Sequence, residues 1–399
     1  MSQSKKDLIS VLGAAIGKKY VLTDQESLKF YSMDVYRSIE IPIAILQPGS
    51  VEELQEVVRV ATGLDVAIVA RGGGASYTDG YLPTTSESVI IDTTRLNKIV
   101  EINEEDMYVI VEPGVTWSEM YEALSAKNLR TPFWGPFSGL KATVGGSTSQ
   151  NSLSMGTSTY GGSPESILCY DIVLANGELL KTGSSAMKNS QPFFRHYGPD
   201  LTGLFSGDAG ALGVKARITL RLIRHPSHTL TCSFGFKDYT SMSQGMAAAA
   251  REQSVSSNWG LDPQLQQGQL GSTTAKDAIQ AAFAVLKTAR NPFEAIIQLG
   301  KMALAGKRFL TGFDYSAHFV VEGYSTAEVK SKLAQTRKVL GPHGTEIANT
   351  IPTVLGAMPF MELYPILGPQ GERWVPMHGI VSFSKMQALH DSLMALYEE

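Results

Sequence analysis

Cysteine is almost absent from this chain, and the little there is matches no familiar pattern. The 399 residues include only Cys169 and Cys232, whose spacing fits neither a metal site nor a redox motif, and two cysteines exclude a disulfide framework. Long apolar runs are also missing: none approaches membrane-spanning length, and no apolar segment of a signal peptide follows the polar residues 1–7. These absences predict a soluble, cytoplasmic protein with no transmembrane segment and no metal site.

An excess of charge of one sign is lacking as well. Lysine and arginine number 34 against 38 aspartates and glutamates, which gives a formal net charge of −4, and there is no basic block. Proteins that bind nucleic acid usually carry such an excess, so no nucleic-acid partner is expected. A composition of 43% hydrophobic and 18% charged residues excludes disorder as the main state, and the length suggests two or three domains.

Glycine, by contrast, is abundant, and its 38 residues are clustered. The first cluster, residues 71–76 (RGGGAS), directly follows a predicted buried strand over 66–70. Adjacent glycines let the backbone approach a ligand closely, and their successive N–H groups form an anion-binding nest that suits a pyrophosphate. A side chain at Gly73 is therefore expected to collide with that group. The spacing GxGxxG is absent, which excludes a dinucleotide fold of the Rossmann kind.

Three more glycine-rich regions follow at strand edges. Residues 113–115 come after a predicted strand over 107–111, and residues 142–161 hold the run ATVGG and then closely spaced Asn, Gly, Ser and Tyr. The last region spans 198–214. Each glycine taken singly also fits an ordinary turn. Such regions beside strands, spread over half of the chain, favour a ligand site over chance turns.

The pattern of elements divides the chain in two. Alternation of apolar and polar residues over 214–222 predicts a strand, and His225-Pro226 ends the pattern, so a domain boundary is expected there. The pair Asn176-Gly177 predicts a type I′ hairpin turn. Helix starts are predicted by three capping boxes: Ser50 with Glu53, Thr116 with Glu119, and Ser325 with Glu328.

Beyond residue 225, strands alternate with polar-capped helices, which predicts an antiparallel sheet with helices on one face. The predicted strands cover 230–236, 317–324 and 374–382, and the predicted helices cover 239–253, 275–304, 325–340 and 384–397. A polar loop is expected over 254–273. The predicted fold class is therefore α+β, with one domain at residues 1–225 and a second at 226–399.

Taken together, the glycine-rich segments resemble the flavin-binding domain of the vanillyl-alcohol oxidase and p-cresol methylhydroxylase (PCMH) superfamily. The resemblance covers residues 40–225 and is nearest to the glycolate oxidase and D-lactate dehydrogenase type. It rests on the segments Gln47–Ser50, Arg71–Ser76, Val111–Val115, Val144–Gly146, Tyr160–Gly161, Asp200–Leu204 and Leu212–Val214. It implies a two-subdomain, PCMH-type domain that holds FAD in an extended form, followed by a cap domain over the flavin.

The resemblance also implies which residues bind FAD. The loop at 71–76 is expected to cradle the pyrophosphate, and the later segments are expected to line the rest of the cofactor. The residues that take these roles in this chain are Arg71, Gly72, Gly73, Gly74, Ala75, Ser76, Pro113, Gly114, Thr143, Val144, Gly145, Gly146, Asn151, Gly156, Ser158, Tyr160, Gly161, Gly210, Gly213 and Val214.

Two departures from the family pattern narrow the expectations. Some members attach FAD through a histidine just after the glycine run; this chain has Ala75 there, so no covalent bond is expected at this loop. Attachment through a cap residue stays open. The late histidine- and glycine-rich motif that supports a metal in hydroxy-acid dehydrogenases is also absent, and residues 374–381 (WVPMHGIV) look more like the cap of the phenol-oxidising branch.

Three residues of the second domain are candidates for catalysis. Oxidation of an alcohol by flavin needs a group that takes the hydroxyl proton, and histidine suits this because its pKa lies near neutrality. His378 and His318 lie on or beside predicted cap strands, and His378 is preferred because of its surrounding motif. Arg373 can clamp a carboxylate with two hydrogen bonds. The alternatives are structural, hydrogen-bonded histidines and a solvated arginine.

The sequence thus predicts an FAD-dependent oxidoreductase. Its small-molecule substrate would be an alcohol, a 2-hydroxy acid or a phenolic side chain, and its electron acceptor would be oxygen, a quinone or a cytochrome. Two alternatives remain: the flavin reductase of peptidoglycan precursor synthesis, and a flavin-binding subunit without turnover of its own. The last predicted helix reaches Glu399, with no returning segment of the kind that completes the flavin site in the resembled families. A truncated cap is therefore expected, or else a partner subunit or a homo-oligomer.

Overall fold

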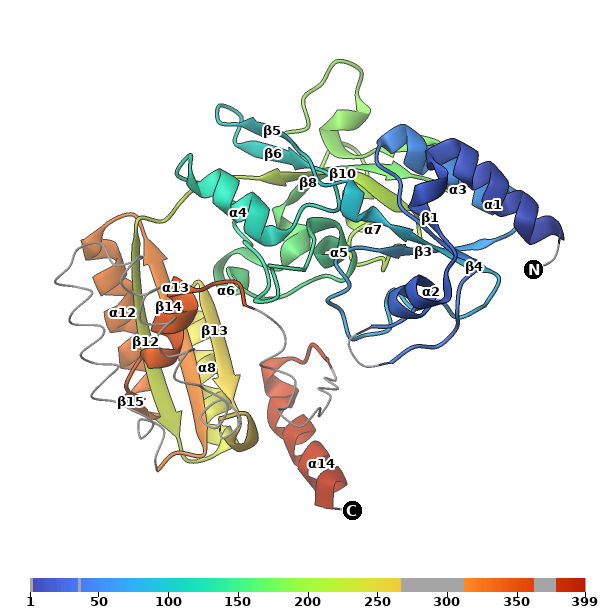
Figure 1. Ribbon diagram of the computed structural model, residues 1–399. Coiled ribbons are helices and arrows are strands. Elements are labelled where there is room, and N and C mark those ends of the chain that lie inside the picture. The colour runs from blue at the N-terminus through green and yellow to red at the C-terminus, as the bar shows by residue number, and fades with distance from the viewer. Residues whose placement is uncertain (1–2, 35–36, 267–311, 362–377, 399) are drawn as a thin grey trace. The chain divides into compact units, whose positions relative to one another are not determined.

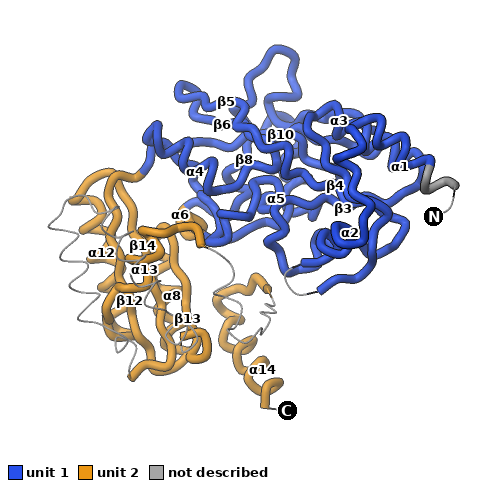
Figure 2. The backbone as a smooth tube through the Cα atoms, in the orientation of Figure 1, with its two compact units in different colours: residues 1–154, 160–225, 362–376 blue, residues 155–159, 226–361, 377–399 orange. Residues whose placement is uncertain are grey.

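The computed structural model describes residues 3–34, 37–266, 312–361 and 378–398. They form two compact units (Figures 1 and 2). Unit 1 contains the described residues of 3–154 and 160–225, and unit 2 contains those of 155–159, 226–361 and 378–398. The chain therefore passes from unit 1 to unit 2 at His225–Pro226, and the short segment 155–159 also belongs to unit 2.

The first sheet of unit 1 has a parallel core. Its order is β1 (Val21–Leu22), β2 (Ala44–Leu46), β4 (Ser88–Asp92) and β3 (Ala67–Arg71), with β2 and β3 parallel to β4. Every residue of β4 is buried, as is usual for a central strand between parallel neighbours. Helices α1 (Gln3–Ile16) and α3 (Val51–Gly63) share an apolar core with this sheet, and α2 (Gln25–Tyr31) packs on β2.

The predicted helix starts of unit 1 are confirmed, with one difference. The Ser50 hydroxyl accepts a hydrogen bond from the Glu53 N–H at 3.2 Å, but the Glu53 carboxylate accepts from the Gly49 N–H, at 2.7 Å, rather than from that of Ser50. In α4 (Trp117–Ser125) both halves of the capping box form between Thr116 and Glu119. Local side-chain chemistry therefore sets where both helices begin.

The second sheet of unit 1 is antiparallel throughout. Its order is β5 (Ile99–Asn103), β6 (Tyr108–Val111), β10 (Val214–Arg221), β8 (Ile167–Val173) and β9 (Leu179–Lys181). The polar face of β10 is only partly exposed: Lys215 and Thr219 are 4% and 5% exposed, whereas the Arg217 side chain is 40% exposed. On the opposite face, Val214 and Ala216 join the core around α1 and α3. The apolar face of this central strand is therefore buried, and its polar face is only partly covered.

The turn between β8 and β9 differs from the predicted type I′. That turn needs positive φ at both central residues, whereas only Gly177 has one, at 81°. The Gly177 N–H donates to the Leu174 carbonyl at 2.8 Å, and the Leu174 N–H donates to the Glu178 carbonyl at 2.9 Å. The loop thus has three residues and ends on a left-handed glycine, a geometry that leaves Asn176 in an ordinary conformation.

Shorter elements complete unit 1. These are β7 (Leu129–Arg130), paired with β11 (Ile223–Arg224), the helices α5 (Val144–Ser149) and α7 (Leu201–Leu204), and 3₁₀ turns at Lys18–Tyr20, Thr93–Arg95, Ser163–Ser166 and Gly183–Ala186. The short helix α6 (Thr157–Tyr160) crosses from unit 2 into unit 1 along the chain. Among the helices that the structure describes, none is long and apolar enough to span a bilayer.

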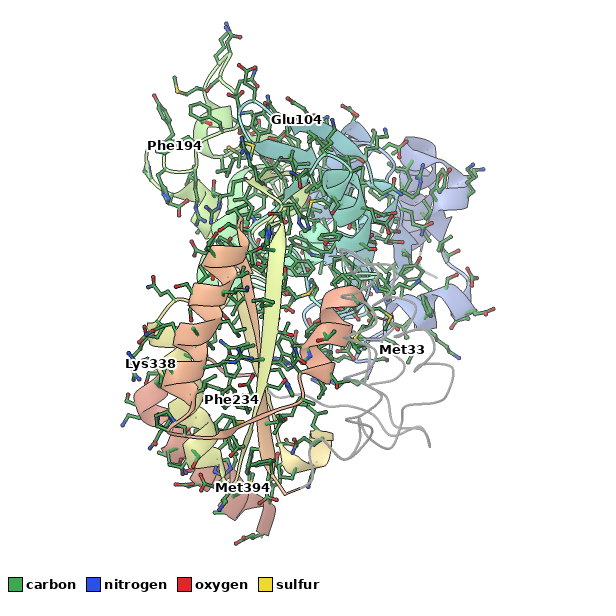
Figure 3. All side chains as sticks on the ribbon, turned by 90° about the vertical axis from the view of Figure 1, so that its left-hand side faces the viewer. Met33, Glu104, Phe194, Phe234, Lys338 and Met394 are labelled. Carbon is green, nitrogen blue, oxygen red and sulfur yellow. The ribbon has the colours of Figure 1, made fainter. Side chains whose placement is uncertain are left out.

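Unit 2 is built on one antiparallel sheet. Its order is β13 (Ser257–Leu261), β14 (Tyr315–Gly323), β12 (His228–Phe236) and β15 (Thr345–Ile347). Helices α8 (Tyr239–Arg251) and α12 (Thr326–Leu340) share an apolar core with β12 and β14, and Ser325 caps α12 as predicted. Helix α13 (Thr350–Ala357) lies on the other side of β12 from α12 (Figure 3). Helices therefore cover both faces, not one as expected.

Three expectations for unit 2 need further comment. The predicted polar loop over 254–273 contains the strand β13. Its sequence, SNWGL, has a low strand propensity, which the pairing with β14 overrides. Residues 378–382, predicted as the end of a strand, are exposed and form no strand, and a 3₁₀ turn (Phe383–Lys385) and α14 (Met386–Glu398) follow. The predicted helix over 275–304 and residues 374–377 lie outside the described residues.

Candidate functional site

The first predicted glycine cluster of unit 1 packs against the segment that precedes α5. A Cβ atom placed on Gly72 would meet the Thr143 side chain, and one placed on Gly73 would meet the Lys141 carbonyl group. Close packing within the protein therefore already excludes a side chain at both positions. Gly73 has a reason to be glycine before any ligand is considered, which the sequence expectation did not include.

The second cluster, at residues 113–115, contacts the start of α5. The Gly145 N–H donates to the Pro113 carbonyl at 2.9 Å, and the Val144 N–H donates to the Val115 carbonyl at 2.8 Å. Thr143 caps the helix, because its hydroxyl accepts from the Gly146 N–H at 3.2 Å. The structure thus brings Pro113 and Gly114 together with residues 143–146, as the sequence predicts for one site.

The third cluster, residues 206–210 within the last glycine-rich region, contacts the other end of α5. The N–H groups of Gly207 and Ala209 donate to the carbonyls of Thr148 and Ser149 at 2.9 and 2.8 Å. A Cβ on Gly210 would lie 3.4 Å from the Cβ of Ala70, in the strand that leads into the first glycine cluster. Glycine clusters that are far apart in the sequence therefore form one assembly, which we call the glycine assembly (residues 71–76, 113–115, 143–151 and 206–210).

Other predicted cofactor residues are placed differently. Asn151 belongs to the glycine assembly and has a left-handed backbone, with φ of 50°. Gly213 packs against β8, since a Cβ there would meet the side chain of Ile172, and Val214 lies in the core around α1 and α3. These two are structural residues in the described chain, and their cofactor role stays a prediction.

The stretch 155–161 divides between the two units. Gly156 and Ser158 belong to unit 2, where the Gly156 N–H donates to the Ser257 hydroxyl at 2.9 Å and the Ser158 N–H donates to the Ser256 carbonyl at 3.2 Å. Tyr160 and Gly161 belong to unit 1. The segment 155–159 is therefore fastened to the sheet of unit 2, and its predicted contact with a cofactor is untested.

Arg71 is the first residue of the glycine loop, and its guanidinium lies inside a cage of aromatic rings. Its guanidinium carbon is 4.8 Å from the ring centre of Tyr31, 5.1 Å from that of Tyr81 and 5.7 Å from that of Phe30. The residue is 8% exposed, and its Nε is buried with no hydrogen-bond partner among the described residues. A Cβ on Gly74 would collide with this guanidinium, so the cation adjoins the loop backbone.

Tyr81 connects this cage to the loop itself. Its hydroxyl lies 2.9 Å from the Gly74 carbonyl oxygen and 3.0 Å from that of Ser76, and donates to both. Further along, the Ser76 hydroxyl is 3.0 Å from that of Thr78. Ala75, which lies between Gly74 and Ser76, is partly exposed. Sequence reasoning missed Tyr81, which closely follows the loop, and Tyr31 and Phe30, which precede it by about 40 positions, because no local pattern connects an aromatic residue to a glycine loop.

A buried ion pair anchors the third cluster. Lys215 Nζ lies 2.7 Å from Asp208 Oδ1, and the two side chains are 2% and 1% exposed. The same Oδ1 accepts from the Gly210 N–H at 3.1 Å, whereas Oδ2 has no partner among the described residues. Burial lowers the pKa of Lys215, opposed by the nearby Asp208. No local sequence pattern indicates this pair, since a lysine on the polar face of a strand is usually solvated.

The glycine assembly fits the pyrophosphate expected from the sequence. A buried guanidinium with an unpartnered Nε supplies positive charge beside the loop. The glycines let the loop backbone pack closely against the Thr143 side chain, the Lys141 carbonyl and the Arg71 guanidinium. Successive N–H groups of such a loop can bind an anion. Ala75 offers no nucleophile for a bond to the flavin. Non-covalent binding of FAD at this loop stays a prediction.

In unit 2, the candidate His318 is fully buried on β14. Its Nδ1 lies 2.8 Å from the Ser233 hydroxyl and its Nε2 lies 3.2 Å from that of Ser316, while the Trp259 ring is 5.9 Å away. Burial lowers the pKa of His318 to about 3, so the ring is neutral at pH 7. A neutral imidazole can accept a proton, but this one has a hydroxyl at each nitrogen, which also fits a structural histidine.

The other two catalytic candidates are less defined. His378 lies in the exposed stretch 378–382, and Arg373 lies outside the described residues. The described structure therefore does not bring the three candidates together, and their catalytic roles stay predictions.

A family model matches this chain mainly within unit 1. Residues 42–183 match the family model described as "FAD binding domain". The D-lactate dehydrogenase [cytochrome] of Arabidopsis thaliana is 32% identical over 237 residues, which are 58% of this chain and 40% of that protein. The glycolate oxidase subunit GlcD of Bacillus subtilis is 32% identical over 199 residues, 49% of this chain and 40% of the relative. The chain thus spans about two fifths of these relatives' length.

Solved structures extend the likeness to most of the chain. The structure of p-cresol methylhydroxylase with substrate bound superimposes with a TM-score of 0.69 at 19% identity, over 94% of this chain and 71% of that one. Alkyldihydroxyacetonephosphate synthase gives 0.66 at 16% identity. At these identities the likeness shows the fold alone, and it confirms the predicted α+β, PCMH-type fold class.

Proposed function

We propose that this chain, whose residues 42–183 are an FAD binding domain of the PCMH type, is an FAD-dependent oxidoreductase. The observation that carries the proposal is the glycine assembly of unit 1, with the buried guanidinium of Arg71 at its centre. In this proposal the loop at 71–76 holds the pyrophosphate, and residues 113–115, 143–151 and 206–210 hold the rest of the cofactor.

The proposed donor is an alcohol, a 2-hydroxy acid or a phenolic side chain. Support comes from the names of similar proteins: D-lactate and D-2-hydroxyglutarate dehydrogenases and a glycolate oxidase subunit act on hydroxy acids, and a 4-cresol dehydrogenase acts on a phenol. The proposed acceptor is oxygen, a quinone or a cytochrome. The cytoplasmic location expected from the sequence remains a prediction.

Bound FAD would supply an isoalloxazine that accepts a hydride. The chain would supply the group that takes the hydroxyl proton of the donor. His318 is neutral at pH 7 and its Nδ1 contacts the Ser233 hydroxyl, so a proton arriving at that hydroxyl could pass to the ring. His378 remains the preferred candidate on its sequence context, and Arg373 is proposed to bind a carboxylate of the donor.

Anaerobic reduction of the flavin tests this proposal. The purified, FAD-loaded chain is mixed with 2-hydroxy acids or with 4-alkylphenols, and the visible flavin band is recorded. Bleaching by one class, with no bleaching by the corresponding acids or ethers that lack the hydroxyl, is expected and identifies the donor class. A flavin that dithionite reduces but that no member of either class reduces would contradict the proposed activity.

A second candidate function is a flavoprotein subunit that needs a partner for turnover. Two similar proteins carry this in their names, the glycolate oxidase subunit GlcD and the flavoprotein subunit of the 4-cresol dehydrogenase of Pseudomonas putida. In that case a donor still bleaches the flavin in a single turnover, but dye acceptors or oxygen fail to reoxidise it at a useful rate. The two candidates therefore differ in the oxidative half-reaction alone.

A further inference from the structure

We propose that Tyr81 is the positioning residue of the phosphate loop: one side chain fixes both the backbone of residues 74–76 and the guanidinium of Arg71. The inference rests on the proposed role of this loop in holding the pyrophosphate. Tyr81 follows the glycine run and is 6% exposed, so its contacts are made inside unit 1 and not with solvent.

The first contact is through the hydroxyl. A single O–H donates to the carbonyl oxygens of Gly74 and Ser76, at 2.9 and 3.0 Å, which ties together two residues on either side of Ala75. Because the hydroxyl holds these two carbonyls, they are kept from turning towards a bound anion, and the N–H groups of the loop can bind it. The hydroxyl therefore acts on the shape of the loop and needs no contact with the cofactor.

The second contact is through the ring. Its centre is 5.1 Å from the guanidinium carbon of Arg71, and Tyr31 faces the same cation at 4.8 Å. Aromatic faces attract a cation without neutralising it, unlike a carboxylate, so the charge of Arg71 stays available to a phosphate. Burial raises the pKa of Tyr81 well above its usual value, so the hydroxyl remains a donor at any physiological pH.

Tyr31 provides a matched control. Its ring belongs to the same cage, but its hydroxyl donates to the Asp92 carboxylate at 3.0 Å and accepts from the Gln47 amide at 3.2 Å, with no bond to the loop. Tyr31→Phe and Tyr81→Phe therefore remove the same atom from the same aromatic cage. They differ in whether that atom holds the glycine loop.

The test is FAD affinity measured by quenching of flavin fluorescence, with apo-protein produced under riboflavin limitation. Tyr81→Phe is expected to weaken FAD binding about tenfold, since two hydrogen bonds that shape the loop are lost. Tyr31→Phe is expected to change affinity by less than about twofold. The urea midpoints of both apo-proteins are measured in parallel, so that a loss of affinity can be separated from a loss of stability.

The salt dependence of FAD affinity tests the second contact, between the Tyr81 ring and Arg71. A tyrosine with a merely structural role would not affect this salt dependence. The wild-type protein and Tyr81→Phe should lose affinity as KCl rises from about 0.05 to 0.5 M, because the charge of Arg71 is screened. Arg71→Met should bind FAD weakly and with little salt dependence. Tyr81→Leu removes one aromatic ring that holds the guanidinium, so its FAD affinity and salt dependence should approach those of Arg71→Met.

Each contrary result has a separate meaning. Wild-type affinity in Tyr81→Phe, or an equal loss in Tyr31→Phe, would overturn the role of Tyr81 while Arg71→Met still binds weakly. Wild-type affinity in Arg71→Met would instead show that the pyrophosphate lies elsewhere, and the proposed phosphate loop and the role of Tyr81 would both be wrong.

Discussion

Two buried ionisable side chains, Arg71 and His318, are accommodated in different ways. Aromatic faces surround the guanidinium of Arg71, and a ligand of opposite charge can complete the site. His318 is neutral at pH 7, because burial between two serine hydroxyls disfavours the protonated ring and lowers its pKa. The sequence proposed both residues as functional, but it could not predict these surroundings, which come from strands and helices distant in the chain.

The neutral state of His318 predicts how stability depends on pH. The pKa is about 3 in the folded protein against 6.5 for an unperturbed histidine, so below pH 6.5 the unfolded chain binds a proton that the folded chain does not. The free energy of unfolding should therefore fall as pH drops from 6.5 towards 3, by about 3 kcal/mol between pH 6.5 and 4 from this group.

Urea unfolding of unit 2 at several pH values checks this expectation. His318→Gln should flatten the acid loss of stability relative to wild type, whatever its own stability at pH 7. His343→Gln, at a partly exposed position after α12, is the control and should keep the wild-type slope. Identical slopes in wild type and His318→Gln would show that His318 is protonated in the folded protein.

At the scale of elements, local signals were reliable where short-range chemistry decides the outcome. The starts of α3, α4 and α12 follow from their capping residues, and β10 follows from its alternating apolar side chains. Prediction failed where pairing decides: β13 is a strand because β14 lies beside it, and the turn at Gly177 follows the geometry of β8 and β9. The helix on the second face of the unit 2 sheet also had no local signal.

The Asp208–Lys215 pair should dominate the stability of the element it holds, the loop from residue 206 to β10. Lys215→Met leaves a buried carboxylate without its cation and should lower the free energy of unfolding by about 3–5 kcal/mol. Adding Asp208→Asn to Lys215→Met should restore part of this loss, because no unpaired buried charge then remains.

Lys332 in α12 offers a matched control for this measurement. It forms an ion pair with Glu328 at the same distance, 2.7 Å, but the two side chains are 37% and 35% exposed. Lys332→Met should therefore cost only about 0–1 kcal/mol in urea unfolding. If Lys215→Met costs no more than Lys332→Met, the buried pair does not hold the loop.

For the whole molecule, the sequence predicted the cofactor and the fold class, and long-range packing supplied what it could not. The glycine clusters were recognisable one by one, but their meeting around α5 depends on hydrogen bonds between residues far apart in the chain, such as Ala209 to Ser149. The identities of substrate and acceptor had no comparable signal, because the similar proteins named above differ in both.

Hydrogen–deuterium exchange with and without FAD tests the central claim most directly, namely that the glycine assembly of unit 1 holds the cofactor. Peptides covering 71–76, 113–115, 143–151 and 206–210 should gain protection together when FAD is added, since FAD would contact all four segments. Peptides from α8 and α12, which belong to the apolar core of unit 2, should not change. Binding of FAD without protection of the four segments would contradict the account.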